Sequence, residues 1–431
     1  MDEDRRYLIL ISLDAVGMED LKILKHLPNF SALLKRGSLI TDVESIYPSL
    51  TYPAHTSIIT GKYPKHHGII NNTKLERNLN HPDWYWYHKD IKGKTLYDVA
   101  EEQGMKTCSI LWPVTARSHI TYNMPEIFGT KKWHNQLWRS LTSGSLSYQL
   151  KMLKHLKLIE KGMTRPVFDQ FTTEVACETI KEYQPQLLML HLLDLDMYKH
   201  DQGLNPKMLK EVLSRFDSQL RKIIDSLKEA NIYEKTVIAV MGDHTQLEVS
   251  KLIRLNTLFI QKGWLKVDTK GRLKSYDVLA KSCDGSTYIY LKNALLKHQV
   301  RQVLEQVEGI ECILEKNEIK ILGADAQADF MVEAKKGYYF VDETSGDLIE
   351  SIHQASDGNV HRYKACHGYL PTKTNYQTFL LMSGVGIKQG YTVKGGSLID
   401  HAPTFAKILG LELKEMDGKA RLWIFNEEVT P

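Results

Sequence analysis

Short, nearly continuous apolar runs alternate along this chain with stretches whose apolar residues recur at helical spacing. The runs predict buried strands, because a strand that is covered on both faces needs no polar side. They lie at Tyr7–Leu13, Cys108–Trp112, Leu187–Leu193, Val237–Met241 and Phe379–Met382. Apolar residues that recur at helical spacing predict an amphipathic helix, and Asn231 is expected to end it. These residues are Phe216, Leu220, Ile223, Ile224 and Leu227. This alternation predicts an α/β fold with a mostly parallel central sheet and helices on both faces.

Two regions interrupt the alternation. Residues 125–170 are rich in lysine, tryptophan and leucine and predict helices or loops over the sheet. Residues 250–360 mix short strand-like runs with charge and glycine, and predict a smaller inserted cap lobe. Because a chain of 431 residues exceeds the size of one compact core, we expect residues 1–250 and 360–431 to form a single α/β core that carries this lobe.

Composition narrows the class of protein. Hydrophobic residues make up 42% of the chain and charged residues 25%, values typical of a globular protein rather than a disordered or membrane-spanning one. The net charge of +4 is too small to predict a stable nucleic-acid partner, but it tolerates anionic substrates. The five cysteines have no paired spacing, and the first apolar run is too short for a signal peptide or a membrane span. We therefore expect a cytoplasmic protein without a membrane anchor.

Acidic residues and histidines follow three of the predicted strands. Asp14 ends the first strand, Asp196 and His200 follow the third, and Asp243 and His244 follow the fourth. Each alone is common in a structural role, such as a helix N-cap, a solvated loop or a surface ion pair. Ligands bind beyond the carboxyl ends of parallel strands, however, so we expect these side chains to converge at one edge of the sheet. Carboxylates and imidazoles together predict a site for zinc or a related divalent ion.

A short helix is predicted to begin at Thr51, with Pro53 in its first turn and Gly61 at its end. One interpretation of Thr51 is an ordinary N-cap, a role worth about 1 kcal/mol. The other is a nucleophile beside a phosphoryl group, since the N-terminus of a helix attracts anions. A metal ion that lowers the pKa of the threonine hydroxyl would favour this second role.

At these positions the sequence resembles the alkaline phosphatase superfamily, and within it the nucleotide pyrophosphatase/phosphodiesterase family. That family carries a nucleophilic threonine before an aromatic–proline pair, then a Thr-Gly-x-Tyr-Pro stretch and a His-Gly-Ile stretch. The resemblance covers most of the chain in blocks and is weakest over residues 250–360. The matching blocks are Pro48-Ser49-Leu50-Thr51-Tyr52-Pro53-Ala54-His55, Thr60-Gly61-Lys62-Tyr63-Pro64, His67-Gly68-Ile69-Ile70-Asn71-Asn72, Trp112-Pro113, Asp196 to His200, Gly242-Asp243-His244, His367-Gly368-Tyr369 and Asp400-His401-Ala402-Pro403-Thr404.

The resemblance implies a site with two divalent metal ions, and zinc is the expected metal. The implied ligands are, for one ion, Asp14, Thr51, Asp243 and His244 and, for the other, Asp196, His200 and His367. The role of His367 comes from the resemblance alone. Asn72 matches an asparagine that contacts a non-bridging phosphate oxygen in the family, whereas Asp194 is expected to have a structural role.

The sequence departs from the family in two respects. Animal members are typically secreted or membrane-anchored and rich in disulfides, and this sequence shows neither feature. The family often has Pro-Asn-His after its nucleophile, where this chain has Pro53-Ala54-His55. This second change leaves the expected chemistry intact and alters the packing around the site.

The resemblance implies a metal-dependent hydrolase that cleaves phosphodiester or pyrophosphate bonds of small nucleotide-type substrates through a covalent intermediate on Thr51. A phosphomonoesterase, phosphonate hydrolase or phosphomutase on the same metal site remains an alternative, because a fold does not determine a substrate. A non-catalytic metal- or nucleotide-binding protein is the alternative from another class. No lysine or arginine adjoins Thr51 and Asn72 is neutral, so we expect a diester to be preferred over a monoester. The aromatic stretch Trp84–Tyr87 either stacks on a base or packs in the core.

Overall fold

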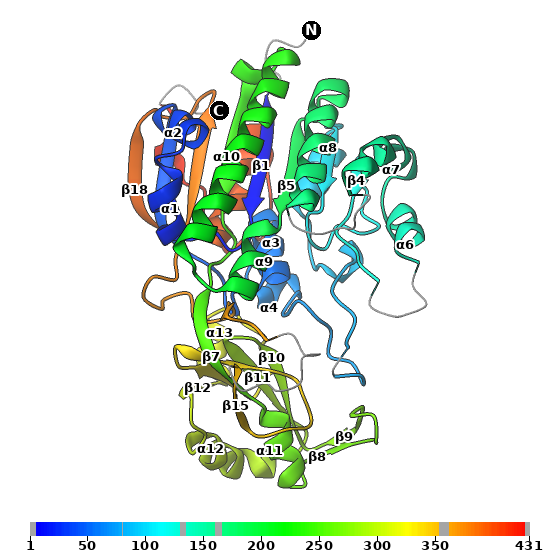
Figure 1. Cartoon of the computed structure of the whole chain (residues 1–431), viewed down its shortest axis with the longest axis vertical. Coiled ribbons are helices and arrows are strands. Elements are labelled where there is room, and N and C mark those ends of the chain that lie inside the picture. The colour runs from blue at the N-terminus through cyan, green and yellow to red at the C-terminus, as the bar shows by residue number, and fades with distance from the viewer. Residues whose placement is uncertain (1–5, 80, 130–134, 160–165, 353–361, 427–431) are drawn as a thin grey trace.

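The large sheet contains a strand at each of the predicted apolar runs. The computed structural model of the chain describes residues 6–79, 81–129, 135–159, 166–352 and 362–426. All strands of this sheet run parallel except β17, which is antiparallel to both of its neighbours. The predicted α/β fold with a mostly parallel sheet is confirmed (Figure 1). The strand order is β18 (Tyr391–Ser397), β2 (Gly37–Glu44), β17 (Thr378–Gly384), β6 (Thr236–Met241), β1 (Tyr7–Leu13), β5 (Leu187–Leu192), β3 (Thr107–Ile110) and β4 (Tyr122–Met124).

Helices cover both faces of this sheet, and each face has its own hydrophobic cluster. Side chains at alternating positions of the central strands enter the two clusters, as Ile9 and Leu10 of β1 illustrate. The helices that pack on the first cluster are α1 (Met18–Leu24), α2 (Pro28–Lys35), α8 (Val167–Tyr183), α9 (Asp194–Gln202) and α10 (Pro206–Glu229). Those on the second cluster are α3 (Thr51–Thr60), α5 (Leu96–Glu102) and α14 (His401–Leu409).

Local sequence signals determine where these helices begin and end. The Asn205 side chain accepts hydrogen bonds from two backbone amides at the start of α10, and Pro206 occupies the first helical position. Asn231, the predicted stop signal, lies just beyond the end of α10 with a φ of 58°. This left-handed conformation is one that asparagine tolerates better than most residues, so the chain can turn away from the helix there.

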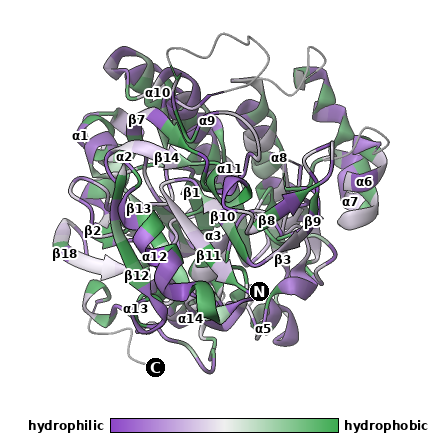
Figure 2. Cartoon of the chain, turned by 90° about the horizontal axis from the view of Figure 1, so that it is seen from below, coloured by the Kyte–Doolittle hydropathy of each residue, from purple (hydrophilic) through white to green (hydrophobic). Residues whose placement is uncertain are grey.

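A second group of strands lies beyond the carboxyl ends of the large sheet (Figure 1) and encloses a separate hydrophobic cluster. Figure 2 views this group from below, with α12 and the strands β10 to β13 in front of the large sheet. One antiparallel sheet has the order β10 (Val278–Cys283), β11 (Ser286–Leu291), β13 (Phe330–Ala334) and β12 (Ile310–Glu315). Beside it lie β7 (Leu247–Ile253), β14 (Gly337–Phe340), β15 (Ile349–Ser351) and β16 (Ala365–Cys366), with the hairpin of β8 (Leu265–Val267) and β9 (Leu273–Tyr276) and the helices α11 (Leu255–Gln261), α12 (Lys297–Glu305) and α13 (Lys316–Ile321).

The division into a core and an inserted lobe of residues 250–360 stays a prediction. The strand β7 begins three residues before the proposed boundary, at Leu247, and residue 360 lies outside the described residues. Between residues 125 and 170 the chain forms α6 (Gln136–Ser143) and α7 (Leu146–Met152), as the helical alternative predicted. The helix α7 packs beside β4 at the edge of the large sheet. No helix in the described residues is long and apolar enough to cross a membrane.

Candidate metal centre

The acidic and histidine side chains predicted to converge come from the carboxyl ends of neighbouring strands. In the middle of the sheet Ser12 of β1 pairs with His191 of β5 on one side and with Met241 of β6 on the other. The three strands therefore end at the same level. Asp14 follows β1, α9 begins directly after β5, and Asp243 follows β6 by two residues.

The first group of side chains consists of Asp14, Asp243 and His244. One ligand atom from each lies within 4.8 Å of the others, and all three side chains are buried. His244 Nε2 is 3.5 Å from a carboxylate oxygen of Asp14 and 3.1 Å from one of Asp243. The hydroxyl oxygen of Thr51 lies 3.1 Å from the same ring nitrogen. The candidate nucleophile therefore adjoins this group.

The second group consists of Asp196, His200 and His367, whose ligand atoms also lie within 4.8 Å of one another. The helix α9 places Asp196 and His200 one turn apart, with His200 Nε2 3.4 Å from the Asp196 carboxylate. His367 follows β16 and comes within 3.9 Å of Asp196. Its ring stacks on that of His244 at a centroid distance of 4.1 Å. The two groups are therefore adjacent.

The electrostatics of these groups fit bound cations. Burial, and then the charges of Asp243 and Asp196, raise the pKa of Asp14 well above its usual value. Burial likewise raises the pKa of Asp243 to about 7. Asp14 Oδ1 and Asp243 Oδ2 are buried without a hydrogen-bond partner in the described structure. A cation beside these oxygens would offset both the lost solvation and the repulsion between carboxylates.

The histidines complete a donor set that suits zinc. Burial lowers the pKa of His367 to about 4, and burial together with the His367 ring lowers the pKa of His244 well below its usual value. Both rings are therefore neutral near pH 7, the form in which imidazole binds a metal. Two carboxylates with one imidazole, beside one carboxylate with two imidazoles, are oxygen and nitrogen ligands typical of zinc sites.

The helix α3 presents Thr51 as its first residue, and Gly61 ends the helix in the left-handed conformation. The sequence predicted both boundaries. Asn72 lies close by, because its side-chain carbonyl accepts a hydrogen bond of 2.9 Å from the backbone amide of Tyr52. This bond fixes the orientation of the Asn72 amide and leaves its NH₂ group as a donor beside the nucleophile.

Two residues that support the site were not predicted from the sequence. The His191 ring is hydrogen-bonded to two carboxyl groups, to Asp14 through Nε2 at 3.1 Å and to Glu126 through Nδ1 at 3.0 Å. Lys199 donates a 2.8 Å hydrogen bond to the carbonyl of Ala15, the residue after Asp14. Their only signal in the sequence is a polar residue placed inside an apolar run or between two candidate ligands. Asp194 lies outside both ligand groups and faces Arg215 at 3.5 Å.

A cavity of about 980 Å³ opens beside the metal centre. Asn72 and Asp284 line it, as does Tyr363, whose ring stacks on His200 at 4.0 Å. Trp84 forms part of the wall, whereas Trp86 is 1% exposed and packs against Tyr52. Trp86 therefore packs in the core, and stacking of Trp84 on a base stays a prediction.

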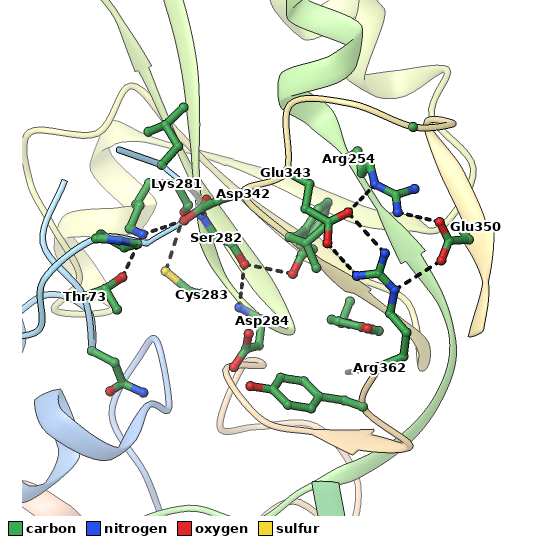
Figure 3. A pocket seen from close by; sticks show the side chains of 18 of the residues that line it. Thr73, Arg254, Lys281, Ser282, Cys283, Asp284, Asp342, Glu343, Glu350 and Arg362 are labelled. Carbon is green, nitrogen blue, oxygen red and sulfur yellow. Dashed lines mark hydrogen bonds and ion pairs between the residues drawn. The ribbon is translucent and has the colours of Figure 1, made fainter. Parts of the chain in front are cut away.

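The cations that line this cavity are paired with carboxylates (Figure 3). Lys281 donates to Asp342 and to the hydroxyl of Thr73. The guanidinium groups of Arg254 and Arg362 bridge the same pair of carboxylates, those of Glu343 and Glu350. The described residues that line the cavity therefore offer a substrate little positive charge that is not already paired.

The mostly parallel sheet flanked by helices is an alkaline phosphatase-like fold, and two candidate ligand groups and a threonine at the start of a helix lie at its carboxyl edge. The sequence model described as type I phosphodiesterase / nucleotide pyrophosphatase matches residues 8–370, and the chain belongs to that family. The resemblance drawn from the sequence motifs is thereby confirmed.

Individual relatives show how far the likeness extends. Human ectonucleotide pyrophosphatase/phosphodiesterase family member 1 is 27% identical over 264 residues, which cover 58% of this chain but only 24% of that protein. Human bis(5'-adenosyl)-triphosphatase ENPP4 is 23% identical over 432 residues, covering 95% of this chain and 80% of that one. The solved structure of murine ectonucleotide pyrophosphatase/phosphodiesterase 5 has a TM-score of 0.68 at 17% identity and covers 98% of this chain and 100% of its own. An inactive form of that murine protein in complex with AMP has the same TM-score and identity over 97% of this chain.

Proposed function

We propose that this chain is a metal-dependent hydrolase of phosphodiester or pyrophosphate bonds that uses Thr51 as its nucleophile. The observation that carries this proposal is the position of the Thr51 hydroxyl, 3.1 Å from His244 in one ligand group that in turn adjoins the other. The N-cap interpretation of Thr51 is wrong, because Leu50 occupies the N-cap position and Thr51 is the first residue of α3. A threonine in a purely structural role has no need of six candidate metal ligands around it.

The described residues divide the work of catalysis. Two divalent ions, most simply zinc, would lower the pKa of the attacking hydroxyl and stabilise the charge of the leaving group when bound. Asp14, Asp243 and His244 would hold one ion, and Asp196, His200 and His367 the other. The Thr51 oxygen attacks the phosphorus while the phosphorus–oxygen bond to the leaving group breaks, and Thr51 carries the remaining phosphate ester until water attacks the same phosphorus and frees the threonine hydroxyl. The free NH₂ of Asn72 and the backbone amides at the start of α3 donate hydrogen bonds to the non-bridging oxygens.

Substitution at Thr51 tests the nucleophile. Thr51→Ala should reduce kcat by at least the ~10²–10⁴-fold typical of losing a group that acts in the transition state. It should still bind two equivalents of zinc, because carboxylates and imidazoles supply the other ligands. Thr51→Ser retains a hydroxyl at the same place and should keep part of the activity. Turnover of the alanine variant at the wild-type rate would instead point to direct attack by water.

Metal removal tests the centre itself. Exhaustive chelation should abolish turnover of a chromogenic phosphodiester, and added zinc should restore it. Activity that survives chelation would contradict the proposal. A catalytically inactive nucleotide-binding protein, the alternative from another class, is excluded by any turnover that depends on both Thr51 and metal.

Nucleotide-type diesters are the substrates that we propose for this site. Support comes from the Trp84 wall of the cavity, from the neutral donor Asn72, and from the pairing of the cavity's cations. A monoester brings one more negative charge than a diester, and the described wall has little charge to neutralise it. A nucleotidyl 4-nitrophenyl diester should therefore have a higher kcat/KM than 4-nitrophenyl phosphate. The reverse order would favour a phosphomonoesterase on the same metal centre.

The cytoplasmic location predicted from the sequence stays a proposal. Fractionation of cells that express the chain, with activity assayed in each fraction, tests it directly.

A further inference from the structure

The turn between β10 and β11 clamps the segment that carries His367. The backbone amide of Gly285 donates a 2.7 Å hydrogen bond to the carbonyl of His367, and the Ser286 hydroxyl donates one of 2.6 Å to the carbonyl of Gly368. Gly368 has a φ of 84°, and a Cβ atom there would overlap the carbonyl oxygen of Cys283. Two backbones therefore approach as closely as a glycine allows, and a turn of the smaller sheet sets the position of a candidate metal ligand.

The two ring nitrogens of His367 face different carboxylates. Nε2 faces Asp196 of the second ligand group at 3.9 Å. Nδ1 is buried and lacks a hydrogen-bond partner in the described structure. The carboxylate of Asp284, the first residue of the turn, lies 3.8 Å from this nitrogen. Its side chain is 26% exposed and borders the cavity shown in Figure 3.

We infer that Asp284 is a positioning residue for the metal centre, and this inference rests on the proposed two-metal function. Its carboxylate accepts the hydrogen of His367 Nδ1, which fixes the ring tautomer and directs the lone pair of Nε2 toward the ion held with Asp196 and His200. Histidine ligands commonly have such a carboxylate partner, which raises their basicity and holds the ring in place. The present separation exceeds hydrogen-bond length by about 1 Å.

One competing acceptor lies near the same ring. The backbone carbonyl of Ser49 also faces His367, but it already accepts a 3.1 Å hydrogen bond from the amide of Gly368. The two acceptors differ in a way that mutation can separate, since the Ser49 carbonyl remains when the Asp284 side chain is removed. Loss of the carboxylate therefore tests whether it, rather than the carbonyl, orients the ring.

The backbone at Asp284 allows a clean substitution. Its φ is 60°, a conformation that glycine adopts without strain, so Asp284→Gly removes the carboxylate and leaves the turn intact. Asp284→Asn is the conservative variant, because its amide oxygen still accepts a hydrogen bond. Asp347→Asn is the matched control: it removes a negative charge from the lining of the same cavity, away from the clamped segment.

The experiment titrates the chelator-treated protein with Zn²⁺ and with Co²⁺, and follows the heat of binding and the Co²⁺ absorption spectrum. We expect Asp284→Gly to lower the affinity for one of the two ions by about 10–100-fold and to alter the Co²⁺ absorption spectrum. Asp284→Asn should recover most of that loss and Asp347→Asn should match the wild type. Equal melting temperatures of the metal-free proteins establish that the fold is retained.

The outcomes separate this inference from the function on which it rests. If the Asp284→Gly variant binds two ions as tightly as the wild type does, Asp284 does not position His367. The Ser49 carbonyl would then be the group that orients the ring. Failure of the wild-type chain to bind two ions would overturn the proposed function itself. An equal loss in Asp347→Asn would show that the charge of the cavity, and not a contact with His367, governs metal affinity.

Discussion

Replacement of Lys199 by methionine should destabilise the protein strongly, although this residue is neither a ligand nor a nucleophile. Lys199 lies on α9 immediately before His200, and its side chain is 2% exposed. The ammonium group donates to the Asp20 carboxylate at 2.6 Å and to the carbonyl of Ala15 at 2.8 Å. Methionine keeps the volume of the stem but leaves the Asp20 carboxylate, 3% exposed, without its countercharge. Breaking a buried pair in this way costs about 3–5 kcal/mol.

Urea unfolding of the metal-free protein measures this loss. The matched control is Lys222→Met, because Lys222 pairs with Glu174 at the surface, where the two side chains are 55% and 33% exposed. Solvent screens that pair, and its removal should change the free energy of unfolding by less than about 1 kcal/mol. Adding Asp20→Asn to Lys199→Met should restore part of the stability, since the buried charge disappears. If Lys199→Met unfolds within about 1 kcal/mol of the wild type, the ion pair does not contribute as its burial implies.

Two further predictions concern protons and backbone strain. Since burial raises the pKa of Asp243 to about 7 in the metal-free protein, zinc must displace a proton below that pH. Zinc affinity should therefore rise as pH increases through about 7, while Asp243 makes the stability of the metal-free protein fall as pH rises from about 4 through about 7. Calorimetry in buffers of different ionisation enthalpy measures the proton release, and a zinc affinity that does not change with pH would contradict the prediction. Gly368→Ala should lower the free energy of unfolding by about 3 kcal/mol, because its Cβ would overlap the Cys283 carbonyl at a φ of 84°. Gly410→Ala is the control, with a φ of 66° in open space, and should lose only about 1 kcal/mol in the same denaturant titration.

The buried strands could be predicted from the sequence because a short, continuous apolar run is typical of a strand that is covered on both faces. The run Tyr7–Leu13 coincides with β1, and the run Val237–Met241 with all but the first residue of β6. The strand β3 ends two residues earlier than predicted, at Ile110, because Leu111 adopts a left-handed φ of 56° and turns the chain away. The edge strand β18 (Tyr391–Ser397) was not predicted, since its exposed residues and paired glycines have no apolar pattern.

The candidate site could be predicted only as far as strand topology determines it. Asp14 and Asp243 follow neighbouring parallel strands, so their convergence follows from the order of the sheet. His367 follows a two-residue strand that pairs with β7, a contact between distant segments that no local pattern records. Lys199 has the same limitation, because its partners lie about 180 positions away along the chain. Residues of this kind support ligands through tertiary contacts, and a sequence pattern alone does not distinguish them from exposed polar positions.

The candidate ligands come from two parts of the fold, the large sheet and the group of smaller strands beyond it. Five of the six candidate ligands follow strands of the large sheet or lie on α9, and the sixth, His367, is held by the β10–β11 turn. The ring of His367 stacks on His244, and the carbonyl of Ala365 on β16 contacts His200 Nδ1 at 2.8 Å, so segments beyond the large sheet contact both ligand groups. We therefore expect metal affinity to depend on how closely the β10–β11 turn approaches the carboxyl edge of the large sheet. The same turn places Asp284 at the wall of the cavity, so the residue proposed to position a metal ligand also borders the space proposed for the substrate.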